Sequence, residues 1–441
     1  MTTILSLIIF LVLLIWIGLI YLSNKKKFRT VKCGNGESYL LSRNMYFIIF
    51  TVCTAPIFLG LLSLLKYGVW FALILLLLFT GKVRAKFEAT TIMYLIFFLW
   101  LCYTMTYTTA PHDGLMLLIK YSIPMLFLWL GYSAIEYKKD LITFLKVVNI
   151  TVCIYCFFIG GQGCKLMPWL YYGPIGAQFL KYAGFADFLT SIFIVPIMLY
   201  WLTKEKKYIF CALWMVLSTV LESVRTGIGG MLLVFMTALL LKKRIKAIPG
   251  ILFAGAMFLG VILLVPKVNE KFFGTDAGKI SATDIVQGNA LSHNKINTNG
   301  RTETWERVMN KCYKGNETYG SGLGVSVRFL KNWAERTKGV TIMHNDYVQI
   351  ISDTGNIGIF LIALFYLILL LKGVMYIILR KGSRCTIITG IMAVSSMVGI
   401  AFSMFYDNVV SHSMSSLVMP FIFLGFFLKF IDIDESKRIS K

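Results

Sequence analysis

The stretch QIISDTGNIGIFLIALFYLILLL, residues 349–371, holds the pattern that decides the fold. From Ile357 onward it is almost continuously apolar, and about 20 apolar residues in a helix cross the hydrocarbon core of a bilayer. Runs of this length recur from one end of the chain to the other. Hydrophobic residues make up 57% of the 441 residues and charged residues only 15%, whereas a soluble domain carries about 25% charged residues. The sequence therefore predicts an all-α, polytopic helical membrane protein.

The basic residues lie in clusters between alternate apolar runs. The clusters are found at residues 25–32, 82–86, 138–139, 204–207, 242–246, 380–384 and 437–441. Lys and Arg mark the cytoplasmic loops of membrane proteins, so this alternation predicts the topology. It also accounts for the formal net charge of +23 without a polyanionic partner, and we expect no nucleic acid to bind.

With these clusters in the cytoplasm, the apolar runs predict about 12–13 transmembrane helices. They are expected at residues 3–22, 45–62, 64–80, 89–108, 115–134, 141–160, 186–203, 208–223, 226–241, 247–265, 349–371, 385–405 and 415–431. The first run lacks a basic segment before it and a small-residue cleavage site after it, so we expect a retained helix rather than a signal peptide. The predicted parts are N-terminal transmembrane helices over residues 1–265, one large extracytoplasmic loop over 266–343, and C-terminal transmembrane helices over 344–441.

The large loop is polar and breaks the positive-inside pattern. Its cations are Arg301, Arg307, Lys311, Lys314, Arg328, Lys331 and Arg336. A long translocated loop tolerates such charge, so a solvated domain is one interpretation, and a cationic surface for an anionic ligand is the other. Trp305 begins an apolar helical stripe that we expect to pack on the membrane domain. The sequence YGSGLG, residues 319–324, is expected to form a flexible turn rather than a phosphate-binding loop.

Three side chains on the outer side are candidates for chemistry. His344 lies where the large loop re-enters the membrane, and histidine takes up a proton near neutral pH. Arg225 lies between two apolar runs with Glu222 one turn away. A charge at such a boundary is either a snorkelling side chain or a functional group. Arg301 directly precedes the helical segment TETWERVMNKCY of the loop.

The motifs around these three residues resemble a known family. GRTETW, residues 300–305, and HNDYVQIISDTGNIG, residues 344–358, are similar to motifs in the large loop and the next span of the bacterial O-antigen ligase and Wzy-type polymerase superfamily. SVRTG, residues 223–227, is similar to the arginine motif of that superfamily, although Val224 separates the serine from the arginine. The resemblance covers about residues 220–360 and elsewhere is limited to the layout of the apolar runs.

The resemblance implies an inverting, metal-independent glycosyltransferase of the GT-C class that needs no cofactor. Arg225 and Arg301 would bind the diphosphate of an undecaprenyl-diphosphate-linked glycan donor, and His344 would serve the hydroxyl of the glycan acceptor. Guanidinium groups bind phosphate oxygens in a bidentate way, which agrees with this division of roles. Asp346 and Tyr347 are expected to orient the imidazole or the sugar. Further candidates for lining the same cavity are Lys120, Asp113 and Asp407.

A metal site is not expected, because no pair of outer carboxylates has convincing spacing for one. The leading hypothesis is a polymerase that joins lipid-linked oligosaccharide repeats into O-antigen or capsular polysaccharide, since polymerases are the more numerous and diverse members of the superfamily. A ligase that transfers finished polymer to lipid A core is the nearest alternative. A transporter or flippase for lipid-linked sugar would place its charged residues near midmembrane, whereas the candidates here lie at the outer boundary.

We expect the chain to lie in the bacterial inner membrane, with its active site on the periplasmic face. The expected partners are the lipid bilayer, the donor and the acceptor. A flippase and a chain-length regulator are further expected partners, because the donor must reach the outer face and the polymer must be given a length.

Overall fold

The computed structural model describes residues 31–32, 38–39, 83–135, 137–163, 185–274, 283–284, 300–337, 342–379 and 382–439. The predicted spans at residues 3–22, 45–62 and 64–80 lie outside the described residues. β1 (Val31–Lys32) and β2 (Ser38–Tyr39) pair antiparallel in a two-stranded sheet. The other described elements are helices, as the sequence predicts.

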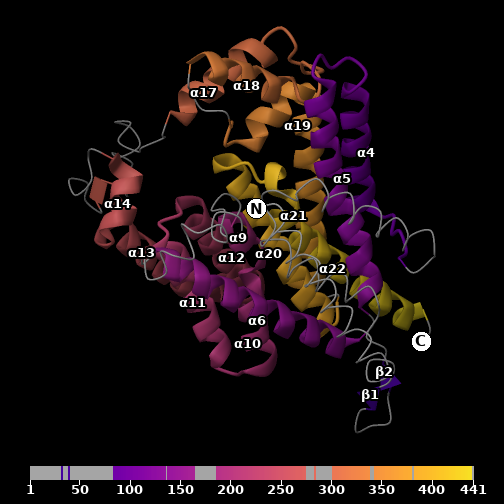
Figure 1. Cartoon of the computed structure of the whole chain (residues 1–441). Helices are drawn as coiled ribbons and strands as arrows, with labels where there is room; N and C mark the ends of the chain where they lie inside the picture. The colour runs from indigo at the N-terminus through magenta and orange to yellow at the C-terminus, as the bar shows by residue number, and fades with distance from the viewer. Residues whose placement is uncertain are drawn as a thin grey trace, which may run out of the picture.

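The helices follow the predicted order along the chain. The first group is α4 (Ala89–Thr104), α5 (Pro111–Ala134), α6 (Lys138–Gly163), α9 (Phe185–Ile192), α10 (Ile194–Thr203), α11 (Lys207–Leu221), α12 (Arg225–Lys243), η1 (Arg244–Ala247) and α13 (Ile248–Leu264). The outer segment contains α14 (Pro266–Phe273), α17 (Arg301–Val308), η3 (Met309–Tyr313) and α18 (Val325–Thr337). The chain then forms α19 (Asp346–Gly373), η4 (Val374–Ile378), α20 (Arg384–Tyr406), η5 (Val410–His412), α21 (Ser413–Ser416) and α22 (Val418–Ile439). In Figure 1, α17 and α18 lie at the top of the molecule, beside the upper ends of α5 and α19.

These helices confirm a multi-pass membrane protein. Within the described residues, six helical segments are long and apolar enough to cross a membrane, or seven if η5–α21 and α22, bent by 57°, form one span. Each predicted span from residue 89 onward has a helix at its position. α4 and α11 have 16 and 15 residues, which is shorter than the roughly 20 residues of a typical span.

α12 and α13 are separate helices joined by a tight reversal. A straight helix from Arg225 to Leu264 has 40 residues and would reach about 60 Å, twice the thickness of the hydrocarbon core. Arg244 has a φ of 56° and ends α12, and Gly250 of α13 lies against Leu239 of α12. The reversal therefore falls in the basic cluster at residues 242–246, where the positive-inside pattern predicts a cytoplasmic turn.

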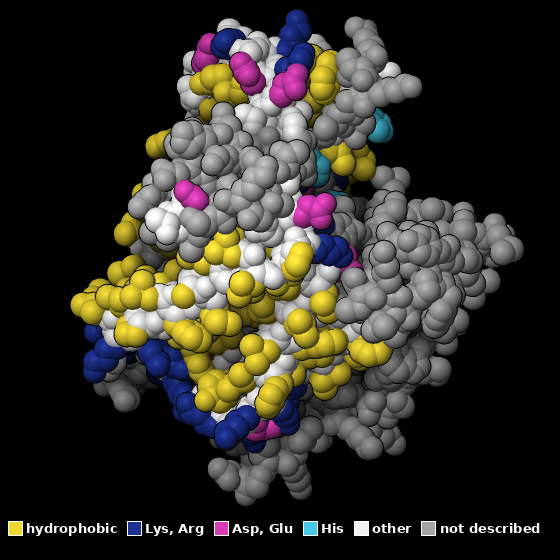
Figure 2. Space-filling view, turned by 90° about the vertical axis from the view of Figure 1, so that its left-hand side faces the viewer, with side chains coloured by type: hydrophobic (Ala, Val, Ile, Leu, Met, Phe, Trp, Pro, Cys, Tyr) yellow, Lys and Arg dark blue, Asp and Glu magenta, His cyan; other side chains and the backbone are white. Residues whose placement is uncertain are grey.

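The surface has the arrangement that a bilayer requires. Figure 2 shows a broad hydrophobic band across the middle of the molecule, with Lys and Arg side chains along its lower edge and charged side chains of both signs at the top. On α13, Leu252 and Phe253 are 68% and 69% exposed. Such exposed apolar surface is stable in lipid rather than in water.

Glycines allow two central helices to pack closely. Gly425 of α22 lies against α5, and a Cβ atom there would come within 2.2 Å of the Leu128 carbonyl oxygen. Gly131 on α5 faces the backbone of Ile422 in the same way. Small residues at such crossings let helix backbones approach, which is how transmembrane helices associate without a hydrophobic driving force.

We predict that Gly425→Ala lowers the free energy of unfolding by about 1–3 kcal/mol, because backbone atoms must move to accept the methyl group. The melting temperature of the purified protein in detergent measures this change. Gly255→Ala is the matched control, since an added Cβ on this α13 glycine meets no described atom within 4 Å. Equal melting temperatures for Gly425→Ala and the wild type would contradict the close crossing.

Candidate functional site

His344 lies directly before α19 and is held in an unusual conformation. Its φ is 50°, in the left-handed region that non-glycine residues occupy rarely and often at functional sites. The next residue, Asn345, caps α19 by accepting a hydrogen bond from the Val348 N–H at 3.0 Å. The Nδ1 atom of His344 lies 3.0 Å from Oδ1 of Asp407. This contact engages Nδ1, so Nε2 is the nitrogen through which the ring can take a proton from a substrate.

Asp407 follows the last residue of α20 and is held as a carboxylate. Burial by itself raises the pKa of Asp407, but contacts with His344 and the Asn408 N–H and the charge of Arg301 outweigh it, and the pKa is lowered. The Asn408 N–H donates to Oδ1 at 2.8 Å. A carboxylate against Nδ1 fixes the orientation of the imidazole and stabilises its protonated form, as in other acid–base pairs.

Arg301 reaches the same end of α20 from the outer loop. It is the first residue of α17 and follows Gly300, whose φ is 73°. Its Nη1 donates to the carbonyl oxygen of Tyr406, next to Asp407. Burial lowers the pKa of Arg301, and the nearby Asp407 carboxylate opposes that shift. Arg301, His344 and Asp407 therefore converge, although they are far apart in the sequence.

Trp305 ties α17 to the membrane helices, as predicted. Its ring lies 5.7 Å from that of Phe405 on α20, and its Nε1 donates to the carbonyl oxygen of Met343 at 2.7 Å. Since Met343 precedes His344, this hydrogen bond fixes the position of the imidazole relative to α17. The apolar stripe of α17 thus positions the site.

Arg225 begins α12 and lies level with the end of α20. The two helices run antiparallel, and a Cβ atom on Gly399 would lie 3.2 Å from the Gly230 carbonyl oxygen. Counting along both helices from this crossing places Arg225 opposite the last turn of α20, which ends at Tyr406. The guanidinium carbon of Arg225 lies 5.6 Å from the centre of the Phe272 ring of α14. Arg225 therefore lies beside α14 at the level of the last turn of α20.

Asp346 and Tyr347 are placed below His344 and make protein contacts. Asp346 is fully buried, and its Oδ2 accepts a hydrogen bond from the Val410 N–H of η5 at 3.0 Å. The Tyr347 hydroxyl donates to the carbonyl oxygen of Ala401 on α20 at 2.9 Å. Tyr347 also borders a cavity of about 370 Å³ between α19 and α20, lined almost wholly by apolar side chains. Their expected role in orienting the imidazole or the sugar remains a prediction.

The sequence analysis missed Asp187 and His412, which lie near the same cluster. Asp187 on α9 is fully buried and lies within electrostatic reach of Asp407 and Asp346. His412 on η5 lies within electrostatic reach of Asp407, His344 and Lys120. An acidic residue inside the apolar run at residues 186–203 was the signal for Asp187, because a charge in a transmembrane segment is functional by default.

The other suggested lining residue, Asp113, joins the outer helices to the bundle. Its Oδ1 accepts a hydrogen bond from Nζ of Lys331 on α18 at 2.6 Å.

The glycine-rich segment at residues 319–324 is not the flexible turn that we expected. Asp353 of α19 accepts hydrogen bonds from the N–H groups of Gly324 and Ser326, both at 2.9 Å. A Cβ atom on Gly324 would lie 2.3 Å from the Gly114 nitrogen, so its positive φ serves a close backbone junction.

Comparison with known proteins identifies a family model that matches part of the chain. Residues 210–363 match the family model described as O-antigen ligase. The matched region runs from α11 into α19 and contains Arg225, Arg301 and His344, whereas Asp407 lies beyond it. No curated protein matches the chain. The resemblance is therefore confirmed over residues 210–363, and within this multi-pass membrane protein that region is similar to the O-antigen ligase family.

Proposed function

We propose that this protein is an inverting, metal-independent glycosyltransferase. Its proposed reaction joins undecaprenyl-diphosphate-linked oligosaccharide repeats into O-antigen or capsular polysaccharide. The observation that carries the proposal is the convergence of His344, Asp407 and Arg301 at the outer end of α20. An imidazole oriented by a carboxylate and a guanidinium beside it supply the base and the phosphate ligand that this reaction needs.

In the proposed step, a hydroxyl oxygen of the acceptor attacks the anomeric carbon of the donor sugar from the face opposite the diphosphate. The new carbon–oxygen bond forms as the bond to the phosphate oxygen breaks, and the polyprenyl diphosphate leaves with that electron pair. Nε2 of His344 takes the hydroxyl proton, and Asp407 stabilises the resulting imidazolium. A well-placed base contributes about 100- to 10,000-fold to the rate of such a step.

Arg225 and Arg301 are proposed to meet the negative charge that grows on the leaving diphosphate. A guanidinium binds two phosphate oxygens at once, and such contacts strengthen where water is scarce. The partial burial of Arg301 supports this role, because a desolvated cation interacts more strongly with an anion. Asp346 and Tyr347, which bind the backbone of η5 and α20, are proposed to hold the two sides of the site together.

The second candidate is a ligase that transfers the finished polymer to lipid A core, and the description of the matching family favours it. A ligase uses the same donor and the same three side chains, so the two candidates differ in the acceptor alone. In either case we propose the bacterial inner membrane as the location and its periplasmic face as the side of the site. A flippase that delivers the donor and a chain-length regulator are the proposed partners.

Alanine at Arg225, Arg301 or His344 should abolish polymer formation while leaving protein abundance unchanged. For Arg301, we predict a loss of roughly 100- to 1,000-fold in the transfer rate. Arg301→Lys should rescue poorly, because an ammonium group lacks the planar fork. The assay uses purified protein with lipid-linked donor and acceptor. Arg307→Ala is the matched control, since Arg307 on the same helix pairs with Glu303 at the exposed surface. Full activity of Arg301→Ala would remove Arg301 from the mechanism.

Asp407→Asn should lower the transfer rate by at least about 100-fold, because an amide cannot stabilise the imidazolium. Since the pKa of Asp407 is lowered in the folded protein, its stabilising effect is present above the ordinary aspartate pKa of about 4. The stabilisation by the Asp407 carboxylate is lost as the pH falls through the lowered pKa of Asp407 in the folded protein. The melting temperature of the wild type should therefore fall more steeply on acidification than that of the variant. Identical rates in the two proteins would exclude Asp407 from the proton transfer.

Glycan profiling of a deletion strain should separate the two candidate functions. If the protein is a polymerase, the deletion strain should make lipid A core that carries a single repeat, because ligation continues without polymerisation. If the protein is a ligase, the strain should make bare core and accumulate lipid-linked polymer. Complementation with the wild-type gene should restore the full profile, and complementation with His344→Ala should not. A normal profile in the deletion strain would contradict both candidates.

A further inference from the structure

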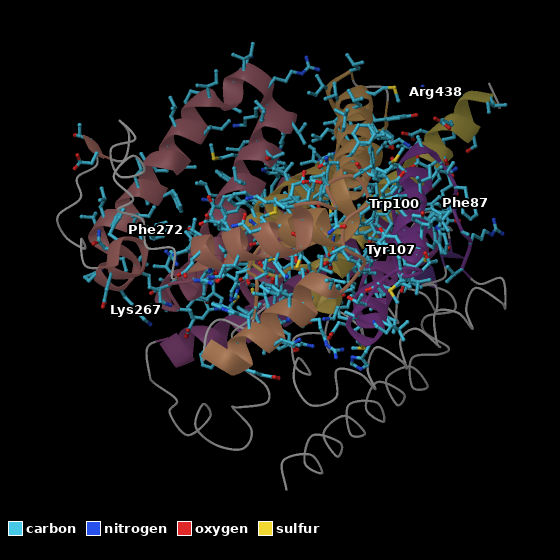
Figure 3. The ribbon with its side chains drawn as sticks, turned by 90° about the horizontal axis from the view of Figure 1, so that it is seen from above. Phe87, Trp100, Tyr107, Lys267, Phe272 and Arg438 are labelled. Atoms are coloured by element: carbon cyan, nitrogen blue, oxygen red, sulfur yellow. The ribbon has the colours of Figure 1, made fainter. Side chains whose placement is uncertain are left out.

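α14 folds back from the end of α13 onto the beginning of α12. Val268 and Phe273 of α14 pack with Ile228 of α12 and Ile262 of α13 in a small apolar cluster. In Figure 3, which looks down on the outer side, Lys267 and Phe272 lie at the edge opposite Trp100 and Tyr107. This packing brings the polar side chains of α14 to the turn between α11 and α12, where Arg225 lies.

Two lysines of α14 contact that turn directly. Nζ of Lys267 donates to the carbonyl oxygen of Leu221 at 3.0 Å, and Nζ of Lys271 donates to the carbonyl oxygen of Glu222 at 3.3 Å. Arg225 begins the next helix, and its guanidinium lies over the ring of Phe272. Three cations, Lys267, Lys271 and Arg225, therefore lie at one short turn together with the carboxylate of Glu222, and Glu270 is the acidic residue of α14.

The electrostatics of this group favour an anion. Burial lowers the pKa of Lys271, the charges of Lys267 and Arg225 lower it further, and Glu222 opposes the shift. Burial also raises the pKa of Glu222, with the two lysines opposing. The charges of Lys267 and Arg225 thus disfavour the protonated form of Lys271, and a bound anion would oppose that repulsion.

The hydrogen bonds of the two lysines cap the C-terminal end of α11. Capping of the α11 carbonyl groups explains these two hydrogen bonds but not why Arg225 adds a third cation to the same turn. The backbone supports a functional interpretation, because Ser223 in this turn has a φ of 56°, in the left-handed region.

We propose that Lys267 and Lys271 bind the diphosphate of the lipid-linked donor together with Arg225. This inference rests on the proposed function and adds two substrate-binding residues to it. A diphosphate ester is a polyanion, which suits a group of three cations. The lysines act as mobile point charges for outer phosphate oxygens, whereas the guanidinium of Arg225 supplies the planar fork. Arg301 lies beside Asp407, which contacts His344.

The test compares four variants with the wild type in phosphatidylcholine nanodiscs. They are the double variant Lys267→Ala/Lys271→Ala, the conservative double variant Lys267→Arg/Lys271→Arg, the control Lys314→Ala at an exposed lysine of the outer loop, and Arg301→Ala. For each protein, kcat, KM for the lipid-linked donor and the inhibition constant of inorganic pyrophosphate are measured. Melting temperatures and equilibrium binding of pyrophosphate are measured on the same samples.

We expect the double alanine variant to raise both KM and the pyrophosphate inhibition constant at least about tenfold, with a smaller change in kcat. The arginine variant and Lys314→Ala should stay near the wild type. Unchanged KM and inhibition constant with a lowered melting temperature would reduce the lysines to helix caps and overturn the proposal. An effect that requires phosphatidylglycerol in the nanodisc would assign the lysines to lipid headgroups and also overturn it.

The binding measurement separates this inference from the proposed function. If the wild type transfers no sugar but binds pyrophosphate through the two lysines, the transferase proposal fails and the anion site stands. If transfer proceeds and the double variant binds pyrophosphate as tightly as the wild type, the transferase proposal stands and the assignment of the lysines fails.

Discussion

The close antiparallel packing of α12 and α20 is the constraint on which the rest of the site depends. Gly230, Gly399 and Thr190 of α9 meet at one crossing, where an added Cβ on Gly230 would lie 2.6 Å from the Thr190 hydroxyl oxygen. Because both helices are rigid, this crossing fixes the height of Arg225 against the end of α20. The end of α20 in turn presents the Tyr406 carbonyl oxygen to Arg301 and the Asp407 carboxylate to His344. Helix packing thereby places the candidate groups at one level of the membrane.

The outer helices are tied to this frame by buried polar contacts. Asp353 accepts hydrogen bonds from the first residues of α18, and Trp305 binds the backbone immediately before His344. Such contacts are costly to break, since a buried donor or acceptor left without a partner loses about 1–3 kcal/mol. These contacts therefore tie α17, which carries Arg301, and α18 to the segment around His344 and to α19. A rigid arrangement suits a reaction in which charge develops at a fixed position.

Much of the fold could be read from hydropathy, because a bilayer imposes length and polarity on every span. The motifs around Arg225, Arg301 and His344 also pointed to the three residues. The sequence could not show that Asp407 is a stronger candidate for the site than Lys120 or Asp113. Its contact with His344, 63 positions away in the chain, leaves no mark in the residues around it. It missed Lys267 and Lys271 because their importance arises only when α14 folds back onto α12. It also mistook the glycine-rich turn for a flexible one, since the backbone that fills its surroundings comes from α5 and α19.

The sequence by itself determined that this is a helical membrane protein. It also determined which ends of the helices lie at the clusters of Lys and Arg, and which motifs resemble a known family. These properties follow from local composition and spacing, because a transmembrane helix satisfies its own backbone hydrogen bonds within the segment. Only the tertiary structure decided which side chains meet. Contacts such as His344 with Asp407, or Lys271 with the turn beside Arg225, depend on helix crossings and on how α14 and α17 dock. Those arrangements are set by packing between distant segments, which no local pattern in the sequence records.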